Sequence, residues 1–498
     1  MNVIRPILFL LSIFFFSSVQ ANITSYFNQI NKDPNALYAF FKTMPKGGEL
    51  HYHLAGGPYP ETMLLLASTG DYCLNKETFT ISKNTGRCDG VKTKDILQEP
   101  QLYSQIIRDW SFKDFVPGKE SGHDHFFNSF MKYMPIIFDY KPALLADVMQ
   151  RAAQQNENYL EIMDIPDNAH SISFGNLIKN SSAFDKKKQL LLNNKDFQNN
   201  INNTVLESER LIEESRKHLS CDKHPEAAPC KLKIKLLYYV LREQDSDNLF
   251  AQALNAFESV SRSKGTLVGV NLVQPEDGLI SLRDYHKQML IFDYLHTIYP
   301  NVNIALHAGE LAAQDVVPEE LGYHIHEALF TGHAQRIGHG SDIAYENDAD
   351  KTLKYMAQNH LPVEINLISN LKILNLSGPN HPLNYYLSHH VPVVLSTDDE
   401  GVLRTDLTRQ YVAAVIDQGL DYPVLKQINR NTLTYSFLPG KSIWANAETA
   451  ELIQDCQDLK SKSCMEFISK SEKAKLQWDL EQQLTVFENK FNNATLLM

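Results

Sequence analysis

The sequence predicts an α/β protein in which eight parallel strands close into a (β/α)8 barrel of the TIM type. It contains eight short apolar runs rich in β-branched residues, each ended by polar residues or glycine. From the third run onward, the runs begin about 26 to 36 residues apart, with helix-like sequence between them. One strand, one helix and two loops need about that much chain, so the spacing indicates a repeated βα unit. The alternative fold is an open α/β sheet of six strands.

The positions of these runs predict how the chain is organised. The eight strands are expected, in order, at residues 49–54, 159–165, 233–241, 267–273, 303–307, 336–339, 362–368 and 391–397. The first two gaps are much longer than the others, so we expect long insertions after strands 1 and 2, and a helical C-terminal tail. The expected segments are a signal peptide at 1–21, an N-terminal segment at 22–45, the barrel domain at 46–440 and the tail at 441–498.

The first 21 residues have the pattern of a cleaved secretory signal peptide. Arg5 is their only charged residue, an apolar run covers residues 6–16, and Val19-Gln20-Ala21 matches a signal peptidase site. The apolar run is shorter than the roughly 20 residues that span a bilayer. We therefore expect an exported protein, periplasmic or secreted, with no membrane attachment after cleavage.

The six cysteines fall into three pairs that are close in the sequence. Six cysteines allow 15 connectivities, but nearest-neighbour pairing closes three short loops in polar sequence. An exported protein keeps such bridges oxidised. The expected disulfides are Cys73–Cys88, Cys221–Cys230 and Cys456–Cys464.

The composition is that of a globular protein with an acidic surface. Hydrophobic residues make up 43% of the chain and charged residues 21%, which excludes a disordered or low-complexity protein. Lys and Arg number 47 against 59 Asp and Glu, giving a net charge of -12. Such a chain is a poor binder of phosphate backbones, so we expect no nucleic-acid partner.

Polar clusters stand at the carboxyl ends of four expected strands, where barrel enzymes have their active sites. His51 and His53 share one face of strand 1, because residues i and i+2 of a strand point to the same side. The other clusters contain His307 and Glu310 after strand 5, His339 after strand 6, and Asp398 and Asp399 after strand 8. A second His-x-His, His324 and His326, lies in a helical pattern and is expected on a helix surface.

Three imidazoles and one carboxylate from these clusters suit Zn²⁺ with one position left for water. A zinc ion lowers the pKa of bound water and generates a nucleophile. Glu310, His339 and Asp399 then remain as acid–base and hydrogen-bonding groups. This set is typical of hydrolytic attack on an electron-poor sp² carbon.

The four clusters, read as motifs in order, resemble the adenosine deaminase family of the amidohydrolase superfamily. The motifs are MPKGGELHYH at 44–53, HAGE at 307–310, RIGHG at 336–340 and STDD at 396–399, and the resemblance covers roughly residues 44–438. The signal peptide, the cysteine-bearing insertion and the segment 362–370 are similar to the secreted, growth-factor-related branch.

The resemblance implies hydrolytic deamination of adenosine or 2′-deoxyadenosine, with a zinc-activated hydroxide attacking purine C6. It implies one zinc ion per chain, with the ligands His51, His53, His307 and Asp398. Glu310 would protonate purine N1, His339 would orient or deprotonate the water, and Asp399 would hydrogen-bond the hydroxide and purine N7. The expected substrate-binding residues are Gly56, Gln274 and Asp399, and the expected partner is a small-molecule purine nucleoside. Homodimerisation is left open.

The sequence departs from the family at two places that concern substrate contacts. Leu54 and Ala55 stand where many members have an Asp that binds a ribose hydroxyl, and Gln274 stands where many have a Gly beside purine N3. Two alternatives therefore stay open. One is an amidohydrolase acting on a different aminopurine, an ester or an amide. Its binuclear members commonly bridge two metals with a modified Lys at the end of strand 4, where this chain has Val273-Gln274-Pro275. The other is a non-catalytic exported binding protein.

Overall fold

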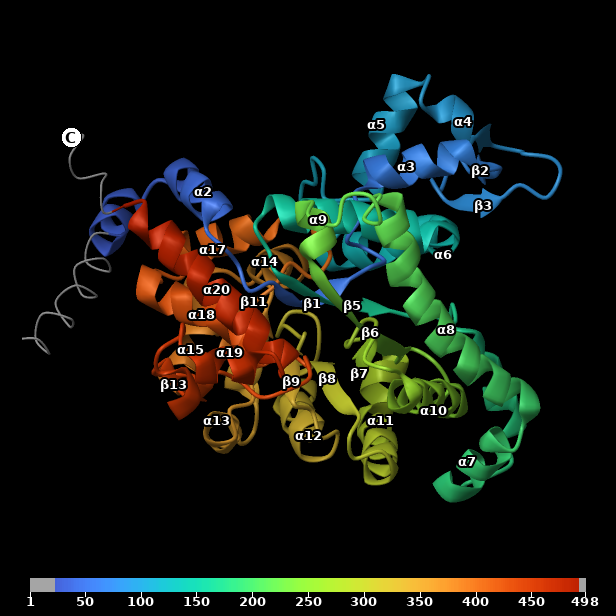
Figure 1. Ribbon diagram of the computed structural model, residues 1–498. Coiled ribbons are helices and arrows are strands. Elements are labelled where there is room, and N and C mark those ends of the chain that lie inside the picture. Colours follow the sequence, from blue (N-terminus) through green and yellow to red (C-terminus); the bar gives the residue numbers. More distant parts are fainter. Residues whose placement is uncertain (1–22, 492–498) are drawn as a thin grey trace, which may run out of the picture.

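The fold is an eight-stranded parallel barrel whose strand order follows the chain. The computed structural model describes residues 23–491, so the signal peptide expected at 1–21 lies outside the described residues. Figure 1 shows the strands in the middle of the molecule with helices around them. The strands are β1 (Glu49–His53), β5 (Tyr159–Asp164), β6 (Lys233–Leu241), β7 (Leu267–Val273), β8 (Asn303–Ala308), β9 (Arg336–His339), β10 (Val363–Ile365) and β11 (Val393–Leu395). The predicted (β/α)8 fold class is confirmed.

The first and last strands meet at a seam formed by two main-chain hydrogen bonds. The amide of His53 donates to the carbonyl of Asp398 at 2.9 Å, and the amide of Asp398 donates to the carbonyl of His51 at 3.2 Å. A parallel bridge joins Tyr52 to Asp398 at the same place. The seam therefore brings the end of β1 beside the residues that follow β11.

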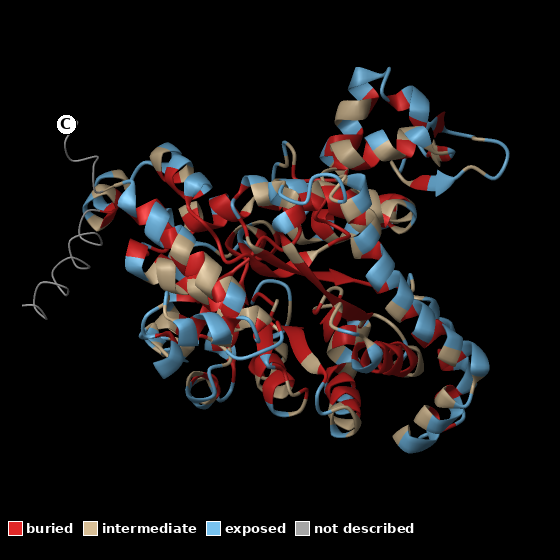
Figure 2. Cartoon of the chain, in the orientation of Figure 1, coloured by how far each residue is buried: buried red, intermediate tan, exposed pale blue. Residues whose placement is uncertain are grey.

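The strands are buried on both faces, as in other parallel sheets covered by helices. Every residue of β5 and β7 is buried, and Figure 2 shows the barrel strands in red while exposed residues lie on the outer sides of the helices. This explains why the strands appear in the sequence as nearly continuous apolar runs. The covering helices include α10 (Ser246–Arg262), α11 (Leu279–Ile298), α12 (His324–Phe330), α13 (Ala349–Gln358), α15 (Leu383–Ser388), α17 (Leu407–Ile416) and α18 (Tyr422–Thr434).

The insertion between β1 and β5 forms a small unit with its own core. Its strands β2, β3 and β4 are antiparallel, and in Figure 1 the unit projects from the barrel at the upper right. Trp110 and Tyr133 of this core pack in one cluster with Ala55, from the loop after β1, and with Val402, from the short helix α16 (Glu400–Leu403) after β11. The insertion therefore covers the carboxyl ends of these strands. It comprises α3 (Pro60–Thr69), β2 (Tyr72–Leu74), β3 (Ile81–Lys83), β4 (Val91–Lys92), α4 (Thr93–Ile96), α5 (Pro100–Asp109) and α6 (Gly122–Gln154).

The second insertion and the C-terminal tail are mainly helical. Between β5 and β6 lie η1 (His170–Leu177), α7 (Phe184–Leu192), α8 (Lys195–His218) and α9 (Ala228–Lys231). The tail contains β12 (Trp444–Asn446), β13 (Glu451–Leu452), α19 (Lys462–Ile468) and α20 (Glu472–Asn489). Leu480, Leu484 and Phe487 of α20 belong to the core cluster of the barrel, together with residues of α2 (Pro34–Thr43). Both ends of the described chain thus pack against the same side of the barrel.

The expected strands at 362–368 and 391–397 are too long. β10 ends at Ile365, and the helix α14 (Leu367–Leu374) begins where a strand was predicted. Leu367, Ile373 and Leu374 are buried on one face of this helix. A short apolar run cannot distinguish a buried strand from the start of a buried helix, which is why the boundary was misplaced.

The described residues contain three disulfides, Cys73–Cys88, Cys221–Cys230 and Cys456–Cys464. The first lies in the insertion after β1, the second precedes β6 and the third lies in the tail. Among residues 23–491, no helix has both the length and the apolar character needed to cross a bilayer.

Opening the disulfide in the tail is expected to lower stability without changing turnover. Cys456 and Cys464 are fully buried and close a loop of 8 positions, for which chain entropy predicts about 2–3 kcal/mol. The double variant Cys456→Ala/Cys464→Ala should therefore unfold at lower denaturant concentration, while kcat stays that of the parent. Peptide mapping under non-reducing conditions tests the pairing, and crossed pairs or free thiols would contradict it.

Candidate active site

Four side chains from three separate strands converge at the carboxyl end of the barrel. His51 and His53 lie on β1, His307 lies on β8, and Asp398 follows β11. The Nε2 atoms of His51 and His53 are each 3.3 Å from Asp398 Oδ1, and His53 Nε2 is 3.1 Å from His307 Nε2. One ligand atom from each of the four residues lies within 4.8 Å of the others. The structure thus brings together all four residues expected to bind a metal.

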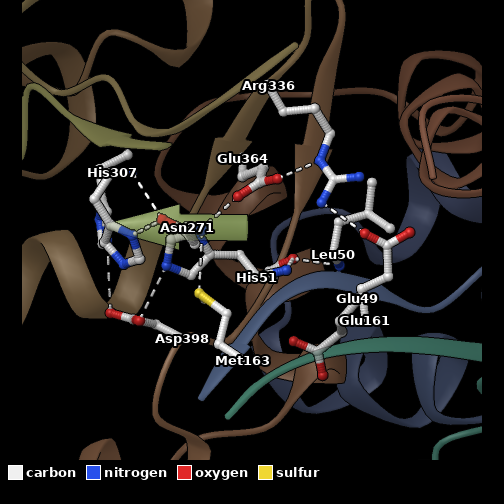
Figure 3. A network of polar contacts seen from close by, with 12 residues as sticks. Glu49, Leu50, His51, Glu161, Met163, Asn271, His307, Arg336, Glu364 and Asp398 are labelled. Carbon is white, nitrogen blue, oxygen red and sulfur yellow. Dashed lines mark hydrogen bonds and ion pairs between the residues drawn. The ribbon is translucent and has the colours of Figure 1, made fainter. Parts of the chain in front are cut away.

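Hydrogen bonds at Nδ1 of His51 and of His307 fix the orientation of the two imidazoles (Figure 3). His51 Nδ1 donates to Glu364 Oε2 at 2.8 Å, and His307 Nδ1 donates to Asn271 Oδ1 at 2.9 Å. Asp398 Oδ2 accepts from the hydroxyl of Ser369 at 2.7 Å. Both histidines therefore present Nε2 to the centre of the site, as metal-ligating histidines commonly do.

A buried chain of ion pairs supports Glu364. Arg336 donates from Nε to Glu364 at 2.6 Å and from a second nitrogen to Glu161 at 2.6 Å (Figure 3). Burial raises the pKa of the Glu364 carboxyl, but Arg336 and His51 lower it more strongly. The pKa of Glu364 therefore lies below its usual value. Sequence reading did not identify Glu364 or Asn271 as supporting residues. The available signal was a single polar residue within an otherwise apolar strand.

These four residues fit a divalent metal ion. His51 Nε2 is buried, has no hydrogen-bond partner among the described residues, and faces the Asp398 carboxylate. Burial lowers the pKa of His51, but the carboxylates of Asp398 and Glu364 raise it to about 9, because they favour a positive charge beside them. Three imidazole nitrogens and one carboxylate are a donor set that zinc favours.

His339 and Glu310 lie beside this cluster. His339 Nε2 is 3.6 Å from Glu310 Oε1 and 3.9 Å from Asp398 Oδ2. On the other side of the ring, Asn370 Nδ2 donates to His339 Nδ1 at 3.0 Å, because the Asn370 oxygen accepts from His381 Nε2. Burial lowers the pKa of His339 to about 3, so the ring is neutral. Its one proton therefore sits on Nε2 and points toward Glu310 and Asp398.

Glu310 is held in the site by a tight turn after β8. Its side chain is only 8% exposed, and burial together with the charge of Asp398 raises its pKa well above the usual range. Gly309 has φ +73°, and a Cβ there would lie 2.3 Å from Asp342 Oδ1. The turn therefore requires glycine, and the surroundings of Glu310 favour the protonated form of its carboxyl.

The three expected substrate-binding residues occupy different surroundings. Asp399 Oδ1 is buried without a hydrogen-bond partner among the described residues, and a Cβ on Gly56 would lie 1.9 Å from it. Gly56 therefore lies against Asp399. Gln274 has φ +90°, a conformation typical of glycine, and its side-chain oxygen accepts from the amide of Glu243 at 2.9 Å.

Two histidines outside the motifs, His123 and His324, contact carboxylates that are distant in the sequence. His123, at the start of α6, contacts Asp277 at 3.0 Å and Asp124 at 3.1 Å. Burial lowers the pKa of His123, but this effect is outweighed by its neighbours. The pKa is raised to about 9 by Asp277, Asp124 and Glu310. His324 is fully buried and contacts Glu276 at 2.6 Å, so the expectation that it lies on a helix surface is wrong. The buried carboxylate of Glu276, which is distant in sequence, holds His324 inside the protein.

A family profile described as Adenosine deaminase matches residues 119–450, which is 332 of the 498 residues. The match begins after β1, so His51 and His53 lie outside it. Similar curated proteins include the adenosine deaminases of Vibrio parahaemolyticus, 31% identical over 161 residues, and Klebsiella pneumoniae, 34% identical over 153 residues. The alignments cover 32% and 30% of this chain but only 42% and 41% of the relatives. The chain thus aligns with about two fifths of their length.

Solved structures of deaminases share the fold. An adenine deaminase from Arthrobacter aurescens superposes with a TM-score of 0.53 at 15% identity, covering 85% of this chain and 99% of that chain. An arabidopsis N6-mAMP deaminase gives 0.52 at 20% identity, with 80% and 95% covered. At these identities the likeness concerns the fold alone.

Proposed function

Because the chain belongs to the adenosine deaminase family, we propose that it hydrolyses the 6-amino group of adenosine and 2′-deoxyadenosine, releasing ammonia. The observation that carries this proposal is the convergence of His51, His53, His307 and Asp398 beside Glu310, His339 and Asp399. We propose one zinc ion per chain at the first four residues. When bound, zinc lowers the pKa of water and so supplies the nucleophile at neutral pH.

The residues around the cluster then have distinct roles. The Glu310 carboxyl donates its proton to purine N1 while the water oxygen adds to C6. The Nε2–H of His339 donates a hydrogen bond to the attacking oxygen. Burial and Asp398 raise the pKa of Asp399 well above its usual value, and the Asp399 carboxyl accepts a hydrogen bond from this oxygen and donates one to purine N7. One of the two water protons goes to the amino group, which leaves as ammonia. The other restores Glu310, and inosine or 2′-deoxyinosine keeps the proton at N1.

The charge balance favours a substrate without a phosphate. The chain has 59 Asp and Glu against 47 Lys and Arg, and no cluster of Lys and Arg stands near the four motifs. A phosphate dianion therefore has no group of cations to bind it. The buried Ala55 also lacks the charged acceptor that a ribose hydroxyl would use.

We expect adenosine and 2′-deoxyadenosine to be deaminated and AMP not to be. A bond between a ribose hydroxyl and a charged acceptor is worth about 1.5–3 kcal/mol, and this chain has no such acceptor at positions 54 and 55. 5′-Deoxyadenosine should therefore keep a kcat/KM within about tenfold of adenosine. Ammonia release measured side by side for adenosine, 5′-deoxyadenosine and AMP tests this. A preference for AMP, or no turnover of any adenine nucleoside, would overturn the proposal.

We also propose that the protein is exported, to a periplasm or outside the cell. Two independent features support this: the signal-peptide pattern of residues 1–21 and the three disulfides. Disulfides persist in oxidising compartments and are rare in the cytosol.

A further inference from the structure

The proposed metal ligand His307 and the proposed proton donor Glu310 stand at the two ends of one turn. The turn leaves β8, which ends at Ala308, and Gly309 has a left-handed conformation. The amides of Gly309 and Glu310 are therefore outside the strand ladder. Buried amides of this kind need partners of another type.

Glu276 supplies those partners. This residue follows β7 and is 1% exposed. Its Oε1 accepts from the amide of Gly309 at 3.1 Å, and its Oε2 accepts from the amide of Glu310 at 2.8 Å. One carboxylate thus binds two successive amides, which fixes both the place and the direction of the turn.

Arg242 holds the opposite end of the turn and also contacts Glu276. This fully buried residue, which follows β6, donates from one guanidinium nitrogen to the carbonyl of His307 at 2.7 Å. Another nitrogen of the same group lies 3.6 Å from Glu276 Oε1. The turn is therefore held at its carbonyl end by Arg242 and at its amide end by Glu276.

His324 completes the arrangement by donating from Nδ1 to Glu276 Oε1 at 2.6 Å. Burial raises the pKa of Glu276, but Arg242 and His324 lower it more strongly, to about 2. Glu276 is therefore a carboxylate that accepts three hydrogen bonds, two on Oε1 and one on Oε2. Arg242, Glu276 and His324 come from three different parts of the chain and lie outside the four motifs.

We infer that Glu276, supported by Arg242 and His324, is a positioning residue that acts through Glu310. It sets the backbone of the turn so that the Glu310 carboxyl faces His339 and Asp398 at the distances observed. This inference rests on the proposed function, because it assigns Glu276 no contact with substrate and no role without the proton transfer by Glu310.

The variant Glu276→Gln tests the inference. A glutamine retains one acceptor oxygen but directs an NH₂ group at one of the two amides, so the turn must shift. We expect kcat to fall about 10- to 100-fold, the loss typical of disturbed supporting groups and of misplacement by about 1 Å. KM should change by less than about threefold, and zinc content should stay at one per chain, because no metal ligand is altered. Loss of zinc in parallel with kcat would overturn the inference.

Glu346 offers a matched control. This carboxylate is also buried and also accepts from two successive amides, those of Ile325 at 2.6 Å and His326 at 3.2 Å. It is not bonded to either amide of the turn. Glu346→Gln should therefore lower stability as Glu276→Gln does, with kcat within about threefold of the parent. An equal fall of kcat in both variants would mean that Glu276 is merely structural.

A double-variant cycle separates this inference from the proposed function. If Glu276 acts through Glu310, then Glu276→Gln should cost less than about threefold in kcat once Glu310 is already glutamine. If the double variant shows the product of the two single losses in kcat, the two residues act independently and the inference is overturned. Full activity of Glu310→Gln alone would instead overturn the proposed function. If Glu276→Gln does not fold, His324→Phe removes the Nδ1 donor while keeping a ring against Tyr285, and an unchanged kcat there would also overturn the inference.

Discussion

The Glu310→Gln variant is expected to have a kcat about 10²–10⁴-fold below the parent, the usual contribution of a general acid. Glutamine has the shape of the protonated carboxyl but cannot give up a proton to purine N1. Glu310 is not among the four proposed ligands, and its carboxyl lies 3.6 Å from Nε2 of the neutral His339 ring. The zinc content and the unfolding midpoint should therefore stay near those of the parent.

Steady-state kinetics and metal analysis of the same preparations measure this prediction. The useful comparison is Asp315→Asn, which changes a carboxyl group in the same electrostatic neighbourhood but outside the cluster. Its kcat for adenosine should be within about threefold of the parent. A near-normal kcat for Glu310→Gln would show that Glu310 is structural and that another group protonates the base.

The His307→Ala variant is expected to lose zinc and activity together. His307 supplies one of the four proposed ligand atoms, and its ring is held by Asn271. Its removal leaves three donors and a gap on one side of the ion. The affinity of a zinc site depends on its protein donors and falls when one of them is missing. Activity should drop to the background of the assay.

Metal stoichiometry by elemental analysis, compared with ammonia release, measures this result. His333→Ala is a suitable control, because His333 pairs with Asp293 on the outside of the barrel and should keep both zinc and turnover. Full activity in a rigorously metal-free preparation of the parent would contradict the mechanism. Two metal ions per chain would instead favour the binuclear amidohydrolase.

The barrel could be predicted because its strands are buried on both faces, so burial appears in the sequence as apolar runs. The ends of β6, β7 and β9 match the predicted ends, since turn residues follow them directly. β10 and β11 are shorter than predicted, because the apolar sequence continues past the strand into α14 or into the site loop. The covering position of the first insertion was not predictable, since it depends on packing between Trp110 and residues far along the chain.

The residues of the site could be predicted only where chemistry is local in sequence. His51, His53, His307, Glu310 and Asp398 stand in short motifs at strand ends. Their supports do not: Glu364, Asn271 and Glu276 each act on a residue of another strand. A sequence pattern contains the side chain that reacts, while the contact that orients it exists only after folding. His324 illustrates this, because its burial depends on Glu276 rather than on its own helix.

The seam between β1 and β11 has a consequence for the order in which the protein can become active. His51 and His53 are among the first residues of the barrel to be synthesised, whereas Asp398 and Asp399 come about four fifths of the way along the chain. The two hydrogen bonds of the seam, and the ligand cluster beside it, cannot form before β11 is available. Every intermediate on the way, and every product of premature termination before residue 398, therefore lacks a complete site. The proposed site is therefore incomplete until about four fifths of the chain has been synthesised.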